Sequence, residues 1–310
     1  MRLTKTLASL GFIWSLIFSQ AASHHAQSKA ITLKGSDTMV LLGQRWAEVY
    51  MKKNPGSRIQ VTGGGSGTGI AALINGTTDI CESSRPMKEK EKEDLKTKTG
   101  KEVVEIPVAV DGLAIYLNVS NPVKELTLDQ IKQIYTGRIT NWKEVGGNAA
   151  KIILYSRENN SGTYAYFKEH VLQNVDFHPA AQTLPGTAAV TNAVSKDPKA
   201  IGYGGIAYAK GIHHVQVKKD ASSPAIEPSM ENVLSAKYPI SRFLYWYVAE
   251  QPSGEIKKLV DWVLGDEGQK LVEAVGYYPL PKPISAAANP AKPPPIIATR
   301  LPIYKHEGGK

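Results

Sequence analysis

The fold of this chain is indicated most directly by the stretch Arg157-Glu158-Asn159-Asn160-Ser161-Gly162-Thr163. The apolar run at 152–155, immediately before this stretch, predicts a buried strand. After it, apolar side chains recur at helical spacing, at Tyr164, Phe167, Val171 and Leu172. We therefore expect a strand, a tight polar turn and a helix that begins near Ser161.

This arrangement is typical of a site for an anion. The first turn of a helix carries backbone N–H groups without intrahelical acceptors, and the helix dipole places positive potential there. Ser161 and Thr163 add hydroxyl donors, and Arg157 adds a planar fork of donors that suits an oxyanion. An ordinary serine N-cap beside a surface arginine would give the same local sequence, so this stretch alone leaves both interpretations open.

The same pattern occurs twice near the start of the chain. A predicted strand at 31–34 is followed by Gly35-Ser36-Asp37-Thr38 and by a helix that ends at Asn54-Pro55-Gly56. A second strand at 58–62 leads into a loop at 63–69 with five glycines, and a helix is expected from Ile70. Glycines let backbone N–H groups approach a ligand closely. The loop lacks the Gly-Lys-Ser/Thr ending of a nucleotide P-loop.

A third strand, at 78–81, precedes the turn Glu82-Ser83-Ser84-Arg85-Pro86. Hydroxyl side chains thus follow four predicted strands, at Ser36/Thr38, Ser66/Thr68, Ser83/Ser84 and Ser161/Thr163. In a parallel α/β sheet the carboxyl ends of the strands meet at one edge, where ligands bind. The pattern predicts an α/β fold in which these four turns share one anion.

The N-terminus has the features of a secretory signal peptide. Arg2 and Lys5 precede a largely apolar segment at 7–18, and small residues follow, so we expect a signal at 1–23 with cleavage within 21–28. Only one cysteine is present, Cys81, and its apolar neighbours predict a buried, unreactive thiol. The expected location of the mature protein is the periplasm or the exterior.

Other chemistries find little support in the sequence. The formal charge of +9, of which Arg2 and Lys5 contribute two, is spread along the chain without aromatic residues among the basic ones, which argues against nucleic acid. The histidine pairs at 24–25 and 213–214 lack the spacing of a zinc site. No Gly-x-Ser-x-Gly elbow has a matching acid and histidine, so a serine hydrolase is not indicated.

Several of these motifs together resemble the periplasmic phosphate-binding protein of the phosphate ABC transporter. They are Gly-Ser-Asp-Thr, the glycine-rich loop, Ser-Ser-Arg-Pro, 108–118, 136–143, 157–163 and 238–242. The resemblance implies a two-lobed periplasmic binding fold, each lobe a mixed sheet flanked by helices, that closes on inorganic phosphate in the cleft. It also implies a monomeric receptor, not an enzyme, that uses no metal or cofactor and delivers phosphate to the permease subunits of an ABC importer.

The resemblance also implies which residues bind the ligand. Thr38 and the backbone of Met39 match the first turn, and Ser66 matches the serine of the glycine-rich loop. The second lobe contributes Arg157, Ser161, Gly162 and Thr163.

One turn departs from the family pattern. Some members place an aspartate, which accepts the proton of bound phosphate, where this chain has Ser84, with Arg85 beside it. We include Ser84 and Arg85 in the predicted site and expect Asp111 to accept the proton, with Asp37 as the alternative. Asp111 before Gly112 could equally be an ordinary turn residue.

The expected organisation follows from the same comparison. Residues 29–112 and 243–283 form lobe 1, residues 113–242 form lobe 2, and the tail at 284–310 is rich in proline and extended. Helices are expected at 128–135 in lobe 2 and at 254–264 and 266–275 in lobe 1. A receptor or sensor for another oxyanion remains an alternative function. A secreted phosphatase with Ser84 or Ser161 as nucleophile is less favoured, because no base or metal ligand lies near either serine in sequence.

Overall fold

The computed structural model describes residues 29–281 of the chain. The predicted signal peptide at 1–23, its cleavage window at 21–28, and the proline-rich tail at 284–310 lie outside the described residues. Residues 282 and 283, expected to end lobe 1, also lie outside them.

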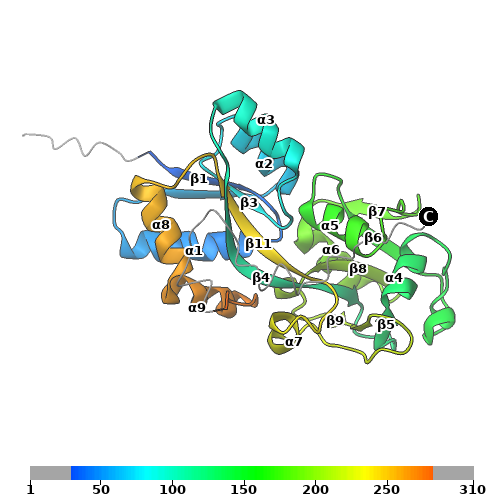
Figure 1. The fold of residues 1–310 in the computed structure, drawn as a ribbon. Coiled ribbons are helices and arrows are strands. Elements are labelled where there is room, and N and C mark those ends of the chain that lie inside the picture. The colour runs from blue at the N-terminus through cyan, green and yellow to red at the C-terminus, as the bar shows by residue number, and fades with distance from the viewer. Residues whose placement is uncertain (1–28, 282–310) are drawn as a thin grey trace, which may run out of the picture.

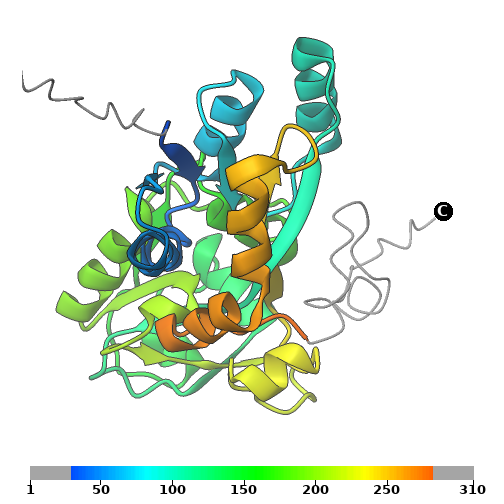
Figure 2. The same cartoon turned by 90° about the vertical axis from the view of Figure 1, so that its left-hand side faces the viewer.

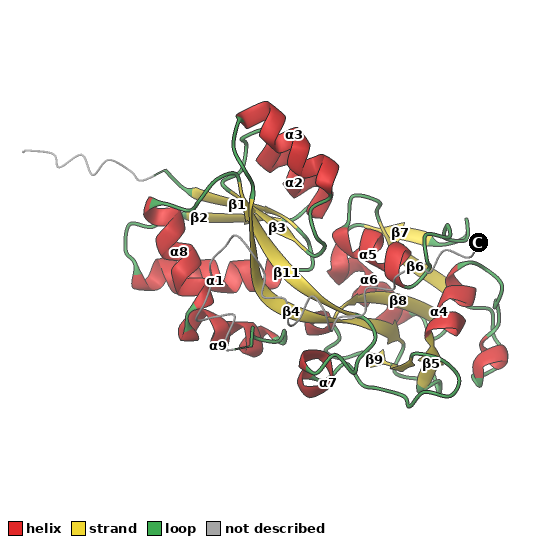
Figure 3. Ribbon diagram, in the orientation of Figure 1, coloured by secondary structure: helices red, strands yellow, loops and turns green. Residues whose placement is uncertain are grey.

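A single mixed sheet runs through the molecule (Figure 3). Its strands lie in the order β2 (Ile59–Thr62), β1 (Ile31–Gly35), β3 (Ile80–Ser83), β11 (Ser241–Val248), β4 (Val104–Leu117), β8 (Ala200–Gly205), β6 (Ile153–Arg157) and β7 (Gln182–Leu184). The short strand β9 (His213–His214) also pairs with β4, and β5 (Glu125–Thr127) pairs with β10 (Gln216–Lys218) in a separate ribbon.

Parallel strands lie at both ends of this sheet and antiparallel strands lie between them. β1 is parallel to β2 and β3, and β6 is parallel to β7 and β8. β4 changes partner along its length, since residues 104–112 pair with β11 and residues 113–117 pair with β8. Both parallel parts are therefore joined through one long strand, which makes the fold a mixed α/β fold.

The helices form two groups at opposite ends of β4 and β11 (Figure 1). The first group contains α1 (Val40–Lys53), α2 (Ser66–Ile74), α3 (Glu89–Thr99), α8 (Gly254–Leu264) and α9 (Asp266–Val275). The second contains α4 (Leu128–Tyr135), α5 (Gly162–His170), α6 (Gly186–Lys196) and α7 (Met230–Leu234), with the short 3-10 helices η1 (Trp142–Val145) and η2 (Ile206–Tyr208). Figure 2 shows α8 and α9 on the same side of the molecule as α1, and the Trp46 indole N–H donates to the Gly268 carbonyl oxygen, 2.9 Å away.

Most predicted elements are confirmed, and two boundaries were wrong. Strand β3, expected at 78–81, spans Ile80–Ser83, so Glu82 and Ser83 belong to the strand rather than to the turn after it. The helices expected at 128–135, 254–264 and 266–275 have those bounds. Helix α2, expected from Ile70, begins at Ser66, because Gly65 turns the chain at a φ of 91° and its carbonyl oxygen accepts a hydrogen bond from the Gly69 N–H. The second half of the glycine-rich loop is thus the first turn of a helix.

The core of the first group encloses a carboxyl group. Glu82 of β3 is fully buried, and its Oε1 accepts a hydrogen bond of 3.2 Å from the indole N–H of Trp246, whose ring contacts Trp46 edge-on. The other carboxyl oxygen, Oε2, has no partner among residues 29–281. Helix α1 passes so close that a Cβ at Gly43 would lie 2.5 Å from Oε1.

Burial raises the pKa of Glu82 from 4.5 to about 8, although the Trp246 hydrogen bond favours the ionised form. The folded protein therefore keeps the Glu82 proton at pH values where the unfolded chain has lost it. Across this interval the unfolded chain binds fewer protons than the folded protein, so the free energy of unfolding decreases as pH rises from about 4.5 to about 8.

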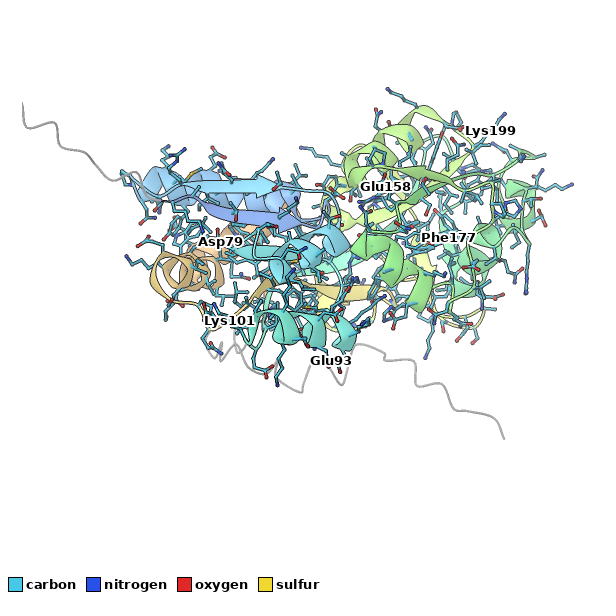
Figure 4. The ribbon with its side chains drawn as sticks, turned by 90° about the horizontal axis from the view of Figure 1, so that it is seen from above. Asp79, Glu93, Lys101, Glu158, Phe177 and Lys199 are labelled. Atoms are coloured by element: carbon cyan, nitrogen blue, oxygen red, sulfur yellow. The ribbon has the colours of Figure 1, made fainter. Side chains whose placement is uncertain are left out.

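We expect Glu82→Gln to remove this part of the pH dependence, because the amide cannot ionise. The variant should gain stability relative to the parent, by a few kcal/mol, when pH is raised from about 5 to about 9. Urea unfolding at several pH values measures the difference. Glu93→Gln is the control, since Glu93 is exposed on α3 (Figure 4), and an equal response of the two variants would contradict the assignment.

Candidate functional site

Hydroxyl groups from the predicted turns meet in the interior. The Thr38 Oγ1 lies 2.8 Å from the Thr163 Oγ1, which lies 3.4 Å from the Ser84 Oγ. The Ser84 Oγ is in turn 3.4 Å from the Ser66 Oγ and accepts a hydrogen bond from the Ser36 hydroxyl at 2.9 Å. We call this set, together with Thr187, the hydroxyl cluster. All of its members are buried.

The cluster lies where four helices begin. Thr38 precedes α1, Ser66 is the first residue of α2, Thr163 is in the first turn of α5 and Thr187 is in the first turn of α6. Backbone N–H groups and the positive ends of the helix dipoles therefore surround the hydroxyl groups. Such a concentration of donors favours an anion.

The start of α5 illustrates how closely these parts approach one another. Ser161 caps the helix, accepting a hydrogen bond of 3.3 Å from the Tyr164 N–H, and the first intrahelical bond runs from Ala165 to Ser161. The N–H groups of Gly162 and Thr163 precede that bond and have no intrahelical acceptor. A Cβ at Gly162 would lie 2.3 Å from the Ser66 Oγ, so only glycine lets these two helices begin side by side.

Arg157 brings a positive charge to the cluster. Its guanidinium is almost fully buried, with Nη1 donating to the Thr187 Oγ1 at 2.7 Å and Nη2 to the Asp37 Oδ2 at 2.6 Å. The third donor, Nε, is buried and has no acceptor among the described residues. Burial lowers the pKa of Arg157 and Asp37 acts against that shift. The group stays protonated, because an arginine does not lose its proton in a protein.

A second guanidinium, that of Arg242, contacts two residues of the cluster, Ser84 and Thr163. Its Nε and Nη2 donate to the Asp111 Oδ2 at 3.0 and 2.9 Å, and Nη1 donates to the Ser84 carbonyl oxygen at 2.9 Å. Nη2 also lies 3.0 Å from the Thr163 Oγ1. Because a guanidinium only donates, the Thr163 oxygen accepts this bond and keeps its own hydrogen for another partner.

Two other hydroxyl oxygens of the cluster also accept a hydrogen bond from a group that can only donate. The Ser66 Oγ accepts from the backbone N–H of Ser84 at 3.1 Å, and the Thr187 Oγ1 accepts from Arg157. Each hydroxyl hydrogen is therefore directed away from a fixed donor. At Thr163, Ser66 and Thr187 the cluster therefore offers hydrogen-bond donors.

Three predicted site residues have contacts that differ from the expected ones. Arg85 is turned towards α3, where its Nη1 and Nη2 donate to the two oxygens of Glu91 at 2.8 and 2.6 Å. The backbone N–H of Met39 already donates to the Ser36 carbonyl oxygen. Asp111 pairs with Arg242 through Oδ2 and accepts from the Ile206 N–H through Oδ1 at 3.0 Å, so neither oxygen is free of partners.

The remaining predicted residues lie together. Thr38, Ser66, Ser84 and Thr163 belong to the hydroxyl cluster, Arg157 contacts it through Thr187, and Ser161 and Gly162 begin the helix beside it. Sequence reasoning did not select Thr187 and Arg242. A signal existed for both, because Thr187 follows a strand and Pro185-Gly186 at a helix start, and Arg242 interrupts an apolar strand.

Residues 29–281 contain no group of three or more His, Cys, Asp or Glu side chains that could hold a metal ion. Within the same range, no helix combines the length and hydrophobicity that a membrane span requires. Cys81 is buried, as predicted, and burial raises the pKa of its thiol well above the ordinary value.

Comparison with known proteins agrees with this geometry. Residues 20–267 match the family profile described as PBP superfamily domain. The phosphate-binding protein PstS of Pseudomonas aeruginosa is 36% identical over 271 residues, which cover 82% of this chain and 84% of the relative. The chain belongs to the PstS family of this superfamily.

Two further proteins support membership of the PstS family. The phosphate-binding protein PstS of Bacillus subtilis is 33% identical over 262 residues, covering 84% of each chain. A crystal structure from Clostridium perfringens, described as a phosphate ABC transporter substrate-binding protein with bound phosphate, is 33% identical and superimposes with a TM-score of 0.74. It covers 82% of this chain and all of the other chain.

Membership of the PstS family confirms two predictions. The fold is the α/β fold of periplasmic binding proteins, and the chain is a binding protein rather than an enzyme. The roles of individual residues in binding stay predictions.

We expect Asp111→Asn to destabilise the protein, because it leaves the Arg242 charge buried without a counterion. The free energy of unfolding should fall by about 3 kcal/mol, as is typical when one partner of a buried ion pair is removed. Urea denaturation measures this change. Asp94→Asn, which removes an exposed ion pair with Lys90, should cost less than about 1 kcal/mol, and similar losses in the two variants would contradict the role of the buried pair.

Proposed function

We propose that the protein is an exported receptor that binds inorganic phosphate and delivers it to the permease subunits of an ABC importer. The observation that carries the proposal is the Nε of Arg157, a buried charged donor without an acceptor among the described residues, beside a cluster of buried hydroxyl donors. An unsatisfied buried donor costs about 1–3 kcal/mol. A tetrahedral oxyanion bound at the cluster would recover that cost.

The ligand would be held by groups from both parts of the sheet. Thr38, Ser66 and Ser84 would donate from the first part, and Arg157, Ser161, Gly162 and Thr163 from the second. The contacts that now join Thr38 to Thr163 and Ser84 to Thr163 cross between these parts. Phosphate would take the place of these contacts, so that each hydroxyl hydrogen finds a charged acceptor.

This function requires two lobes that move relative to each other. We assign residues 29–112 and 243–283 to lobe 1 and residues 113–242 to lobe 2. The assignment is supported by β4, whose pairing changes from β11 to β8 between Gly112 and Leu113, and by the two groups of helices in Figure 1. Among the described strands, only β4 and β11 connect the two lobes and would have to flex when the cleft opens.

The remaining features of the proposal concern location and partners. The apolar N-terminal segment that follows Arg2 and Lys5 supports export to the periplasm or the exterior, with removal of residues 1–23. We propose a monomer that binds no nucleic acid and needs neither metal nor cofactor. Phosphate and the permease subunits are the partners that the family supports.

A receptor for a different tetrahedral oxyanion is the second candidate. The two carboxylates expected to accept the proton of phosphate both have other partners. Asp37 accepts from Arg157 and from the Gly64 N–H, and Asp111 accepts from Arg242 and from the Ile206 N–H. Hydrogen phosphate carries a proton that needs an acceptor, whereas sulfate carries none. Because neither carboxylate is free to accept the proton of hydrogen phosphate, binding of phosphate and of sulfate should be compared directly.

Isothermal titration with phosphate, sulfate and molybdate, together with a phosphoester hydrolysis assay, tests the proposal. We expect one phosphate to bind per chain, more tightly than the other anions, and no hydrolysis. Preferential binding of sulfate or molybdate would favour the second candidate, and hydrolysis would contradict the assignment as a receptor.

We expect Arg157→Met to weaken phosphate binding by about a hundredfold or more, because a desolvated charged donor is removed while the bulk of the side chain is kept. Titration calorimetry measures the loss, and circular dichroism checks that the variant is folded. Arg138→Met removes the same charge from an exposed position and should leave affinity nearly unchanged. Equal affinities for the Arg157 variant and the parent would contradict the proposed site.

A further inference from the structure

A second layer of contacts joins the two parts of the chain outside the hydroxyl cluster. The Asn160 side-chain amide donates to the Gly64 carbonyl oxygen at 3.0 Å and to the Thr68 Oγ1 at 3.3 Å. The backbone carbonyl oxygen of Asn160 accepts from the Gly67 N–H at 2.9 Å. One residue of the β6–α5 turn thus bonds three residues of the glycine-rich segment.

Asp37 forms a second connection beside the first. Its Oδ1 accepts from the Gly64 N–H at 2.7 Å, and its Oδ2 accepts from Arg157. Its backbone carbonyl oxygen accepts from the Tyr208 hydroxyl at 2.8 Å. Asp37 therefore links the turn after β1, the glycine-rich segment and two residues of the other part.

The glycine-rich segment is shaped for these contacts. A Cβ at Gly63 would lie 2.4 Å from the Asp37 Oδ1, and a Cβ at Gly65 would lie 2.7 Å from the Asn160 carbonyl oxygen. Gly64 and Gly65 also have φ values of 108° and 91°, which disfavour other residues. Glycine at positions 63 and 65 therefore allows Asp37 and Asn160 to come within contact distance of this segment.

This layer differs from the hydroxyl cluster in exposure. The Asp37 side chain is 20% exposed and Asn160 is partly exposed, whereas every hydroxyl of the cluster is buried. Contacts at the outside of a buried site must break before a ligand leaves. They do not need to touch the ligand to affect how long it stays.

We propose that Asp37 and Asn160 form a clasp across the cleft that controls the rate at which phosphate is released, without contributing to recognition of the ligand. The proposal rests on the proposed function. The clasp exists only in the closed protein, so its loss speeds opening and release. Phosphate enters through the open protein, in which the clasp is already broken, so the association rate does not depend on it.

Asn160→Ala is the direct test, because Asn160 is neutral and its removal leaves the charge beside the phosphate unchanged. Asn159→Ala is the matched control, since it removes the same amide from an exposed position in the same turn. Stopped-flow mixing with phosphate gives the association rate, and dilution into excess competing phosphate-binding protein gives the release rate.

We expect Asn160→Ala to release phosphate about tenfold faster, as the loss of two partly exposed hydrogen bonds implies, with an association rate within about twofold of the parent. Asn159→Ala should match the parent in both rates. An unchanged release rate in Asn160→Ala, or a slower association that accounts for its loss of affinity, would overturn the clasp.

Amide hydrogen exchange separates this result from the proposed function. The Gly64 N–H donates to the Asp37 carboxylate and the Gly67 N–H to the backbone carbonyl oxygen of residue 160, and Asn160→Ala keeps both acceptors. Both N–H groups should therefore exchange faster in Asn160→Ala only because the clasp opens more often, and not in Asn159→Ala, whichever anion the protein binds. Unchanged exchange would overturn the clasp even if phosphate binds. Faster exchange in a protein that binds no phosphate in calorimetry would support the clasp and overturn the proposed ligand.

Discussion

Burial of the Arg157 guanidinium is the constraint on which the site depends. A charged group that loses its water needs partners, since an unpaired buried charge is strongly unfavourable. Asp37 and Thr187 serve two of its nitrogens, and the third has no acceptor among residues 29–281. The donors around it are neutral hydroxyl and amide groups. Such surroundings stabilise an anion and leave the guanidinium incompletely satisfied without one.

The topology of the sheet makes this concentration of donors possible. Thr38 and Thr163 are separated by 125 positions in the sequence, yet their hydroxyl oxygens are 2.8 Å apart. Each stands near the end of a strand and at the start of a helix, and β4 and β11 connect the two parts of the sheet that carry them. Arg242 of β11 pairs with Asp111 of β4 and donates hydrogen bonds to the Thr163 hydroxyl and the Ser84 carbonyl oxygen. The strands that would flex therefore also hold the site in place.

Much of the fold and part of the candidate site could be predicted from the sequence. Helix bounds were accurate where apolar spacing and end signals coincide, as at 254–264 and 266–275. The convergence of Thr38, Ser66 and Thr163 followed from the repeated order of strand, hydroxyl turn and helix. Local patterns carry this information because each strand and helix start is encoded by neighbouring residues.

Side-chain pairing could not be predicted in the same way. Arg85 bonds Glu91 in the first turn of α3, and Asp111 bonds Arg242, which is 131 positions later in the chain. Which of several arginines faces which carboxylate depends on tertiary packing, and no local pattern records it. The start of α2 at Ser66 was missed for a related reason, because runs of glycine normally predict a loop rather than a helix.

A crystal structure of the protein grown with phosphate tests the central claim most directly. We predict one phosphate with its oxygens within hydrogen-bond distance of Thr38, Ser66, Arg157 and Thr163, with the Arg242–Asp111 ion pair intact behind it. A phosphate bound elsewhere, with the hydroxyl groups of Thr38 and Thr163 still bonded to each other, would contradict the account.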